Sequence, residues 1–336
     1  MREGFRYLSE QDVLSLGGDD AQAALDDVCE VIRLMRQQQS EMPAETHVTL
    51  GAADGKAYAL PARVGGRFNA VGVKWTAHRP QTQDGLPQAM ALTLINRADN
   101  GLPLGLVESR TLTATRTAAV TALALRYAAP RRVRQVLLLG AGVQAMAHLE
   151  MLRQLFPNLQ QVNWWYRNPG AMPVTTTDFP WPVVKIDQLA DALAAQNEAL
   201  ITCTSASTPF LDVEAMRPGR VVIQVGYHEV SFAAINRASR VAVDLWGDFC
   251  ESSAKSLFQM YRAGQFSAQQ VDADVGNLLI DGWRPDREDS VYFSSFGLNV
   301  FDIALASRML QLATERGVGT LLPLFPAEHY VSPAKK

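Results

Sequence analysis

A short glycine-rich turn is the first place where this sequence has the residues for a defined chemistry. An apolar, strand-like run at 136–139 is separated from a helical pattern by Gly140-Ala141-Gly142-Val143-Gln144-Ala145. This spacing matches G-x-G-x-x-[G/A], in which glycines allow a tight turn and let the backbone approach a pyrophosphate. We therefore expect residues 140–144 to bind the phosphates of a dinucleotide.

The end of the following strand indicates which dinucleotide binds. NAD-binding proteins usually place an Asp or Glu on the ribose hydroxyls, about 20 residues beyond the glycines. Here the strand-like run QVNWWYR ends in Tyr166 and Arg167, and Asn168 follows. With no carboxylate to repel a 2′-phosphate, Arg167 can pair with that phosphate. The sequence therefore favours NADP(H) over NAD(H), bound by these three residues.

Polar residues also follow a later strand-like segment, ALITCTSASTPFL. Thr204 and Ser205 stand where the carboxyl ends of parallel strands bind ligands in open α/β sheets, so we expect both to bind the cofactor. Cys203 beside them is expected to be buried packing rather than a nucleophile, because no histidine lies nearby in sequence.

The surrounding pattern predicts the elements that position these residues. An amphipathic helix is expected over 20–38, followed by strands of an antiparallel sheet with a hairpin turn at 99–101. An Ala-rich helix from Leu112 ends before Pro130, and strand–helix alternation then predicts a Rossmann-type, doubly wound parallel sheet between about 130 and 245. Two more helices are expected, over 253–264 and 298–317. We expect a Rossmann domain over 113–304 and an α+β dimerisation and substrate domain over 1–112 and 305–336.

Composition favours work on a small molecule. The 336 residues are 48% hydrophobic and 19% charged, with a net charge of -3, which offers no broad basic face for nucleic acid or an anionic membrane. Cys29, Cys203 and Cys250 lie far apart, so neither a metal site nor a disulfide framework is indicated. No signal-like or membrane-spanning apolar run occurs, and we expect a cytoplasmic protein.

Four motifs together give the sequence a resemblance to the ornithine cyclodeaminase/mu-crystallin family. They are GVKW at 72–75, TATRTAAVTALAL at 113–125, the GAGVQA turn, and FSSFGLNVFD at 293–302. Within the family, the chain most resembles the amino-acid dehydrogenases of siderophore clusters, which oxidise N-(2-amino-2-carboxyethyl)-glutamate to 2,3-diaminopropionate and 2-oxoglutarate. The resemblance implies a homodimer, in keeping with the apolar segment GTLLPLFPAEHYV near the C-terminus.

The resemblance also implies roles for individual residues. Lys74 matches a lysine that meets the substrate carboxylate, and Arg116 matches an arginine shared by the substrate and the cofactor. Thr117, which follows Arg116 on the Ala-rich helix, is expected to meet the pyrophosphate. For Lys74 and Arg116 the alternative is a structural salt bridge. The remaining cofactor-binding residues on this basis are Val225, Ser295 and Gly297.

The site departs from the cyclodeaminase pattern at three places. Glu45 stands where cyclodeaminases have a substrate-binding arginine, and Lys56 stands where they have a glutamate, so a cyclising ornithine site is doubtful. The catalytic aspartate is replaced by His228 or Glu229, depending on a shift of one residue, and either can act as a general acid/base. Asp302 is expected to begin or cap the last long helix.

These observations predict an NAD(P)-dependent amino-acid dehydrogenase or imine reductase. Such an enzyme transfers a hydride between C4 of nicotinamide and the α-carbon of an amino or imino acid. Two alternatives remain: an ammonia-releasing lyase like ornithine cyclodeaminase, and a mu-crystallin-like protein that binds NADPH and a small ligand.

Overall fold

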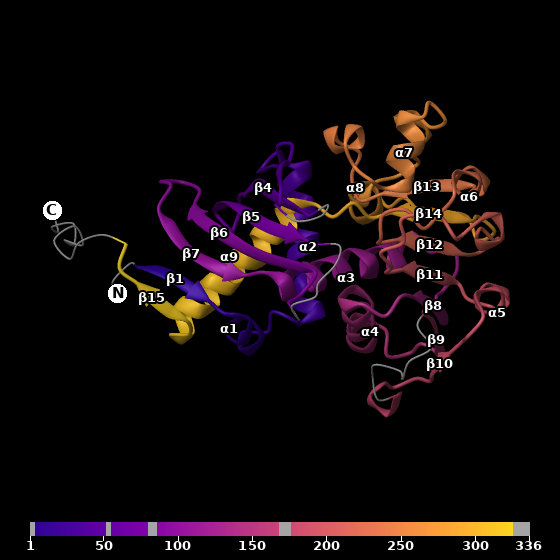
Figure 1. Cartoon of the computed structure of the whole chain (residues 1–336), viewed down its shortest axis with the longest axis horizontal. Helices are drawn as coiled ribbons and strands as arrows, with labels where there is room; N and C mark the ends of the chain where they lie inside the picture. Colours follow the sequence, from indigo (N-terminus) through magenta and orange to yellow (C-terminus); the bar gives the residue numbers. More distant parts are fainter. Residues whose placement is uncertain (1–3, 52–54, 80–85, 168–175, 325–336) are drawn as a thin grey trace. The chain divides into compact units, whose positions relative to one another are not determined.

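The computed structural model describes residues 4–51, 55–79, 86–167 and 176–324. The chain folds into two compact units (Figure 1). Unit 1 comprises residues 1–20, 34–113 and 299–336, and unit 2 comprises residues 21–33 and 114–298. Residues 21–33 were expected in the first domain. They cluster instead with unit 2, where the amide of Ala21 donates to Gln154 Oε1 over 2.8 Å.

Unit 1 is built on one mixed sheet, in which β1 and β7 are parallel and the other pairs are antiparallel. The strand order is β15-β1-β7-β6-β5-β4-β2, with β3 also paired to β4. The predicted hairpin turn is confirmed, since Gly101 has a φ of 74° and lies between β6 and β7. The strands are β1 (Phe5–Leu8), β2 (Ser40–Glu41), β3 (Thr46–Thr49), β4 (Lys56–Val64), β5 (Ala70–His78), β6 (Ala89–Arg97), β7 (Pro103–Glu108) and β15 (Thr320–Leu322).

Strict alternation of side chains gives this sheet two different faces. The long helix α9 (Asn299–Arg316) packs against β4, β5, β6 and β7, as Figure 1 shows, and Ser307 Oγ donates to the Phe68 carbonyl over 3.0 Å. The opposite face leaves apolar side chains accessible, namely Val71, Trp75, Met90 and Leu92. The short helix α1 (Glu10–Ser15) completes unit 1 and begins with a capping box from Ser9.

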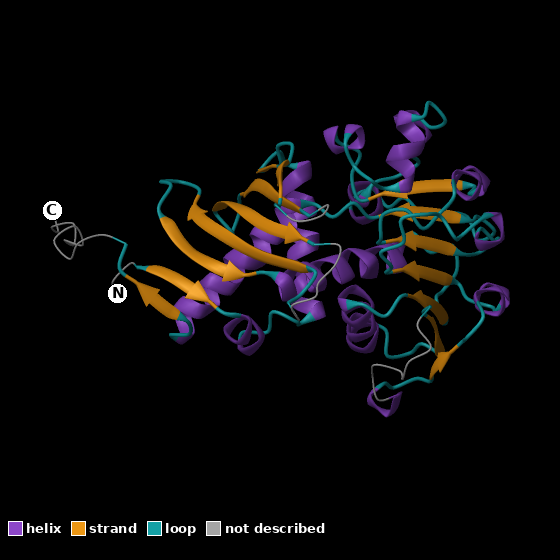
Figure 2. Ribbon diagram, viewed as in Figure 1, coloured by secondary structure: helices purple, strands orange, loops and turns teal. Residues whose placement is uncertain are grey.

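Unit 2 is a doubly wound parallel sheet, as the alternating pattern predicts. Its strand order is β10-β9-β8-β11-β12-β14-β13, and helices lie on both sides of the strands (Figure 2). The two strands that were not predicted from the sequence, β13 and β14, come last among the strands of unit 2. The strands are β8 (Gln135–Leu139), β9 (Gln161–Trp165), β10 (Val183–Lys185), β11 (Ala199–Thr202), β12 (Val221–Gln224), β13 (Arg240–Val243) and β14 (Val291–Ser294).

Helix bounds agree with the sequence pattern to within a few residues at most ends. The Ala-rich helix is buried almost all round, with Ala119, Val120 and Leu123 fully inaccessible. No helix in the described part of the chain is long and apolar enough to cross a membrane. Beside α1 and α9, the helices are α2 (Ala21–Arg36), α3 (Arg110–Tyr127), α4 (Val143–Leu155), α5 (Leu189–Ala194), α6 (Phe232–Arg237), α7 (Ser256–Arg262) and α8 (Val275–Leu279), with 3-10 turns η1 (Thr176–Asp178), η2 (Val213–Ala215), η3 (Asp248–Glu251) and η4 (Ala268–Gln270).

A buried histidine joins α3 to α4 within unit 2. His148 is inaccessible to solvent; its Nδ1 lies 2.7 Å from the Gln144 carbonyl and its Nε2 lies 2.9 Å from Thr121 Oγ1. Because a carbonyl only accepts, Nδ1 carries the hydrogen and Nε2 accepts from the Thr121 hydroxyl. Burial lowers the pKa of His148 from 6.5 to about 4, so the folded protein holds this imidazole uncharged.

Acidification should therefore weaken the fold through His148. Between pH 6.5 and about 4 the unfolded chain binds this proton more strongly than the folded protein, so the free energy of unfolding falls as the pH falls. Across that window the wild type should lose roughly 3 kcal/mol more than His148→Gln, which has no imidazole to protonate. Urea unfolding of both proteins at a series of pH values measures the difference. Parallel pH profiles would contradict the assignment.

Candidate active site

The glycine turn of unit 2 has the geometry of a phosphate-binding turn. Gly140 has a φ of 110°, and a Cβ there would lie 2.3 Å from the carbonyl oxygen of Cys203, so only glycine fits. A Cβ on Gly142 would meet nothing within 4 Å, and Gly142 begins α4 without a side-chain cap. Ala141, Gly142 and Val143 are exposed, so the first amides of α4 are accessible to an anion.

Two polar atoms near this turn fit a ligand with hydroxyl groups. Gln144 Oε1 and the Tyr166 hydroxyl are buried and have no hydrogen-bond partner within the described residues. Ala145, by contrast, is fully buried and keeps α4 close to the sheet. Because buried polar atoms normally find partners, these two atoms favour a bound molecule that supplies them.

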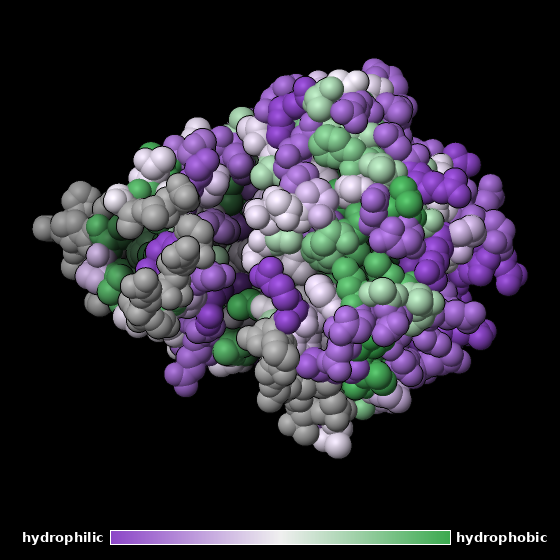
Figure 3. All heavy atoms as spheres, turned by 45° about the vertical axis from the view of Figure 1, so that its right-hand side comes forward, coloured by the Kyte–Doolittle hydropathy of each residue, from purple (hydrophilic) through white to green (hydrophobic). Residues whose placement is uncertain are grey.

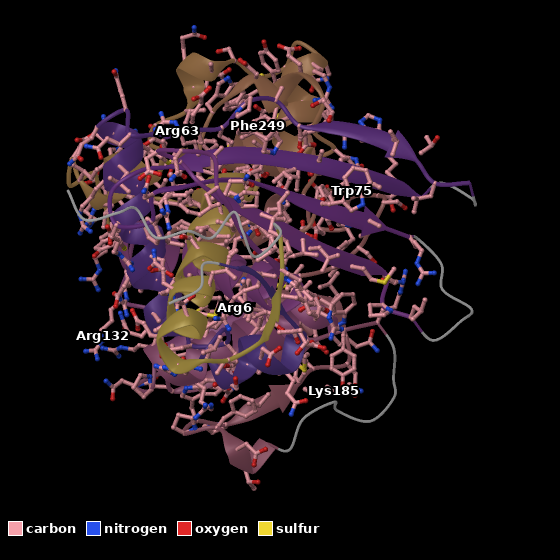
Figure 4. The ribbon with its side chains drawn as sticks, turned by 90° about the vertical axis from the view of Figure 1, so that its left-hand side faces the viewer. Arg6, Arg63, Trp75, Arg132, Lys185 and Phe249 are labelled. Atoms are coloured by element: carbon pink, nitrogen blue, oxygen red, sulfur yellow. The ribbon has the colours of Figure 1, made fainter. Side chains whose placement is uncertain are left out.

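A cation lies at or just after the end of each of the strands β9 and β10, and a carboxylate follows β10. Arg167 is exposed directly after β9, and Asn168 lies outside the described residues. Lys185, labelled in Figure 4, is the last residue of β10; its Nζ lies 5.0 Å from the centre of the Tyr166 ring and 3.4 Å from Asp187 Oδ1. Lys185 was not among the residues predicted from the sequence, although the signal was present, because a lysine follows the short apolar run that forms β10.

Glu229 is a buried anchor for two strand ends. It is inaccessible to solvent, and its Oε1 accepts hydrogen bonds from the Thr204 amide at 3.3 Å and the Thr204 hydroxyl at 3.0 Å. Its Oε2 accepts from Gln224 Nε2 at 3.0 Å. Both oxygens are thus used within the protein.

The two residues on either side of Thr204 differ in exposure. Ser205 is exposed, whereas Cys203 is buried. Burial raises the pKa of the Cys203 thiol well above its ordinary value, which agrees with a packing role.

His228 lies closer to solvent than its neighbour Glu229. It is half-buried, its Nδ1 lies 3.1 Å from Ser256 Oγ, and its ring meets Phe232 edge-on. Large apolar side chains on this edge, Val143 and Tyr227, are about half exposed at 55% and 52%. Figure 3 shows that hydrophobic residues (green) form patches among hydrophilic residues (purple) on the surface that faces the viewer.

Lys255 holds the end of β12 and was missed by the sequence analysis. It is 1% exposed, and its Nζ donates to the carbonyls of Val225 and Gly226 at 2.6 Å each. Burial lowers the pKa of Lys255 to about 8, against the opposing charges of Glu229 and Asp244. Val225, expected at the cofactor, therefore has its carbonyl bonded to Lys255, and its amide donates to the Thr202 carbonyl over 3.1 Å.

Arg116 is brought against the end of β14. Gly297 has a φ of 97°, and a Cβ there would lie 2.6 Å from Arg116 Nη1, so the glycine makes room for the guanidinium. The Gly297 amide donates to Asp244 Oδ2 over 2.6 Å, and Asp244 is fully buried. Arg116 is 6% exposed, Thr117 beside it on α3 is 7% exposed, and Ser295 is 2% exposed.

In unit 1, Lys74 forms a buried ion pair with Asp302. The Nζ–Oδ2 distance is 2.9 Å, and the two residues are 3% and 1% exposed. Asp302 Oδ1 also accepts from Thr113 Oγ1 over 3.3 Å. Asp302 neither begins nor caps α9 as expected, since the helix starts at Asn299 and Asp302 lies within its first turn. A structural salt bridge was the stated alternative for Lys74, and this pair provides one.

The two residues that depart from the cyclodeaminase pattern also lie in unit 1. Glu45 is half-buried; burial raises the pKa of its carboxyl, while the charges of Lys74 and His47 lower it. Lys56 is exposed and lies opposite His78 in the β4–β5 register. Within the described residues, no group of three or more His, Cys, Asp or Glu could hold a metal ion.

Comparison with known proteins gives consistent matches along almost the whole chain. The sequence model of the ornithine cyclodeaminase/mu-crystallin family matches residues 16–316. N-((2S)-2-amino-2-carboxyethyl)-L-glutamate dehydrogenase of Staphylococcus aureus is 22% identical over 97% of this chain and 100% of its own length.

Two solved structures have the same fold. Δ(1)-pyrroline-2-carboxylate reductase of Thermococcus litoralis, in complex with NADH and L-proline, has a TM-score of 0.85 and 22% identity, covering 95% of this chain and all of that one. An archaeal alanine dehydrogenase dimer with bound NAD has a TM-score of 0.83 and 23% identity, covering 96% and 99% of the two chains.

Proposed function

Because the chain belongs to the ornithine cyclodeaminase/mu-crystallin family, we propose that it is an NAD(P)-dependent oxidoreductase acting on the C–N bond of an amino or imino acid. The observation that carries the proposal is the accessible glycine turn at 140–142, with unpartnered buried atoms on Gln144 and Tyr166 beside it. The S. aureus relative is named a dehydrogenase, and the T. litoralis structure holds NADH and an amino acid.

When bound, the nicotinamide supplies or accepts a hydride, and the protein holds the reacting groups in position. The glycine turn and the start of α4 would bind the pyrophosphate. Thr204, Ser205 and Ser295 would border the nicotinamide, since all three follow strands that end at the same edge of the sheet. Arg116, pressed against Gly297 on that edge, would bind the substrate carboxylate through its planar guanidinium.

Of the two candidates, His228 and Glu229, we propose His228 as the general acid/base. Both carboxylate oxygens of Glu229 accept hydrogen bonds from Thr204 and Gln224, and the residue is inaccessible. A group that exchanges protons with a substrate must come within hydrogen-bond reach of it. His228 is half-buried on the same loop and so retains an accessible side.

We propose that NADP(H) is preferred over NAD(H). Arg167 follows β9 by two residues and Lys185 ends the neighbouring strand β10, at the sheet edge where the adenosine ribose binds in this class of fold. Neither Tyr166 nor Arg167 offers a carboxylate to a ribose hydroxyl, and a 2′-phosphate would instead meet a positive charge.

We also propose that the protein forms a homodimer through the uncovered face of the unit 1 sheet. Val71, Trp75, Met90 and Leu92 on β5 and β6 are 36–46% exposed and share that face, on which Figure 4 labels Trp75. A flat apolar sheet face of this kind suits a second copy of itself. The related archaeal alanine dehydrogenase is a dimer.

Substitution of Arg116 tests the proposed reaction. Amino acids, and 2-oxo acid plus amine pairs, are screened by following the absorbance of reduced nicotinamide. Arg116→Lys keeps the charge but loses the two-bond geometry, which should lower kcat/KM by roughly ten- to a hundredfold. Arg132→Lys, at an exposed position, is the matched control. Turnover of an accepted substrate by Arg116→Lys at the wild-type rate would reduce Arg116 to a structural role.

Substitution of Arg167 tests the cofactor preference. Arg167→Ala removes a cation that would pair with the 2′-phosphate, so the KM for NADPH should rise roughly tenfold or more while that for NADH changes little. Arg237→Ala, on the exposed side of α6, should leave both constants unchanged. Steady-state kinetics with the two cofactors measures the effect, and equal changes would refute the preference.

A charge placed on the apolar sheet face tests the dimer. Trp75→Glu should convert a dimer into monomers at micromolar concentration, because a buried unpaired carboxylate is costly in an apolar interface. Leu14→Glu is the control, since Leu14 on α1 is as exposed at 45% as Trp75 at 46%. Light scattering gives the mass of each protein. A monomeric wild type would show that the face is not an interface.

A further inference from the structure

We propose that Ser256, held by Gln224, is a positioning residue that keeps His228 in the tautomer with hydrogen on Nε2, so that His228 meets the substrate as a hydrogen-bond donor. The role of His228 towards a substrate rests on the proposed function. The tautomer itself follows from the geometry of unit 2. The residues on which the tautomer depends all lie in unit 2.

Gln224 has one orientation in this network. Tyr292 donates its hydroxyl to Gln224 Oε1, and burial raises the pKa of Tyr292, so this phenol remains a donor. On the other side, Gln224 Nε2 donates to Glu229 Oε2 over 3.0 Å. A reversed amide would set its carbonyl oxygen against the carboxylate of Glu229, which cannot donate. All three side chains are inaccessible to solvent.

This orientation decides what the Ser256 hydroxyl does. Gln224 Nε2 has two hydrogens and three acceptors around it: the Tyr227 carbonyl, Glu229 Oε2, and Ser256 Oγ at 3.1 Å. Because this amide nitrogen cannot accept, the Ser256 hydroxyl cannot donate its hydrogen on that side. Its own hydrogen then needs an acceptor, because Ser256 is fully buried. That acceptor is Nδ1 of His228, at 3.1 Å.

An imidazole nitrogen that accepts a hydrogen bond carries no hydrogen. The uncharged ring of His228 therefore has its hydrogen on Nε2, on the side of the ring away from Ser256. The opposite tautomer would leave the buried Ser256 hydroxyl without an acceptor, which is unfavourable. Consequently His228 offers a donor, and not a lone pair, to the group that approaches it.

The backbone holds the histidine and the serine at a fixed separation. The Ser256 amide donates to the Tyr227 carbonyl over 2.8 Å, and Gln224 Nε2 lies 3.1 Å from the same carbonyl. Tyr227 directly precedes His228, so the start of α7 and the loop after β12 are joined next to the imidazole. Ser256 itself is buried behind His228 and would act through it.

Nuclear magnetic resonance of the full chain labelled with 15N-histidine tests the tautomer without any substrate. The chain has five histidines, and His228→Gln identifies the signals of His228. At mildly alkaline pH we expect a protonated Nε2 and an unprotonated Nδ1. Ser256→Ala should give a mixture of tautomers, and Ser256→Thr should restore the wild-type spectrum. Ser231→Ala, which removes a helix cap at the other end of the same loop, should leave His228 unchanged.

Kinetics provides the second measurement. Ser256→Ala should lower kcat by roughly tenfold with little change in the KM for the cofactor, and Ser256→Thr should recover most of the loss. A protonated Nδ1 in the wild type, or an Ser256→Ala spectrum identical to the wild type, would overturn the inference. If the spectra are as expected but no amino or imino acid is turned over, the positioning stands and the proposed function fails.

Discussion

Two buried carboxylates, Glu229 and Asp244, tie together the strand ends on which the candidate site depends. Glu229 bonds to Thr204 after β11 and to Gln224 at the end of β12. Asp244, directly after β13, bonds to Gly297 after β14. Carboxylates are stable in such a place only where donors surround them, and Lys255 adds a buried positive charge nearby. Loss of either acid would remove the side-chain link between two neighbouring strand ends, which the backbone ladders pair only up to the last residue of each strand.

Buried charges of opposite sign face one another in both units. Arg116 and Lys255 contribute two positive charges near Glu229 and Asp244, so the interior of this edge is close to neutral. Unit 1 follows the same rule with a single pair, Lys74 and Asp302, which come from β5 and α9. In both units the buried charges join elements that are distant along the chain.

Local patterns predicted the parts of the fold that depend on neighbouring residues. The glycine turn, the hairpin at Gly101, the Ala-rich helix and five of the parallel strands follow from spacing within short windows. Asp244, Lys255 and Ser256 were missed because they look like ordinary residues between a strand and a helix. Asp244 bonds to the segment after β14, which lies between β12 and β13 in the sheet. Lys255 and Ser256 contact the end of β12 and the loop that follows it. Asp302 was misassigned for a similar reason, since its partner Lys74 lies on a different element.

Because β14 lies late in the sequence but inside the sheet, part of the unit 2 sheet can form only late in protein synthesis. Strands β8 to β12 can pair as soon as they are made, but β13 has no partner in this sheet until residues 291–294 have been added. The glycine turn is therefore complete long before the opposite side of the edge exists. A nascent chain can expose β12 and β13 as open edges during this interval, when such edges are prone to incorrect association.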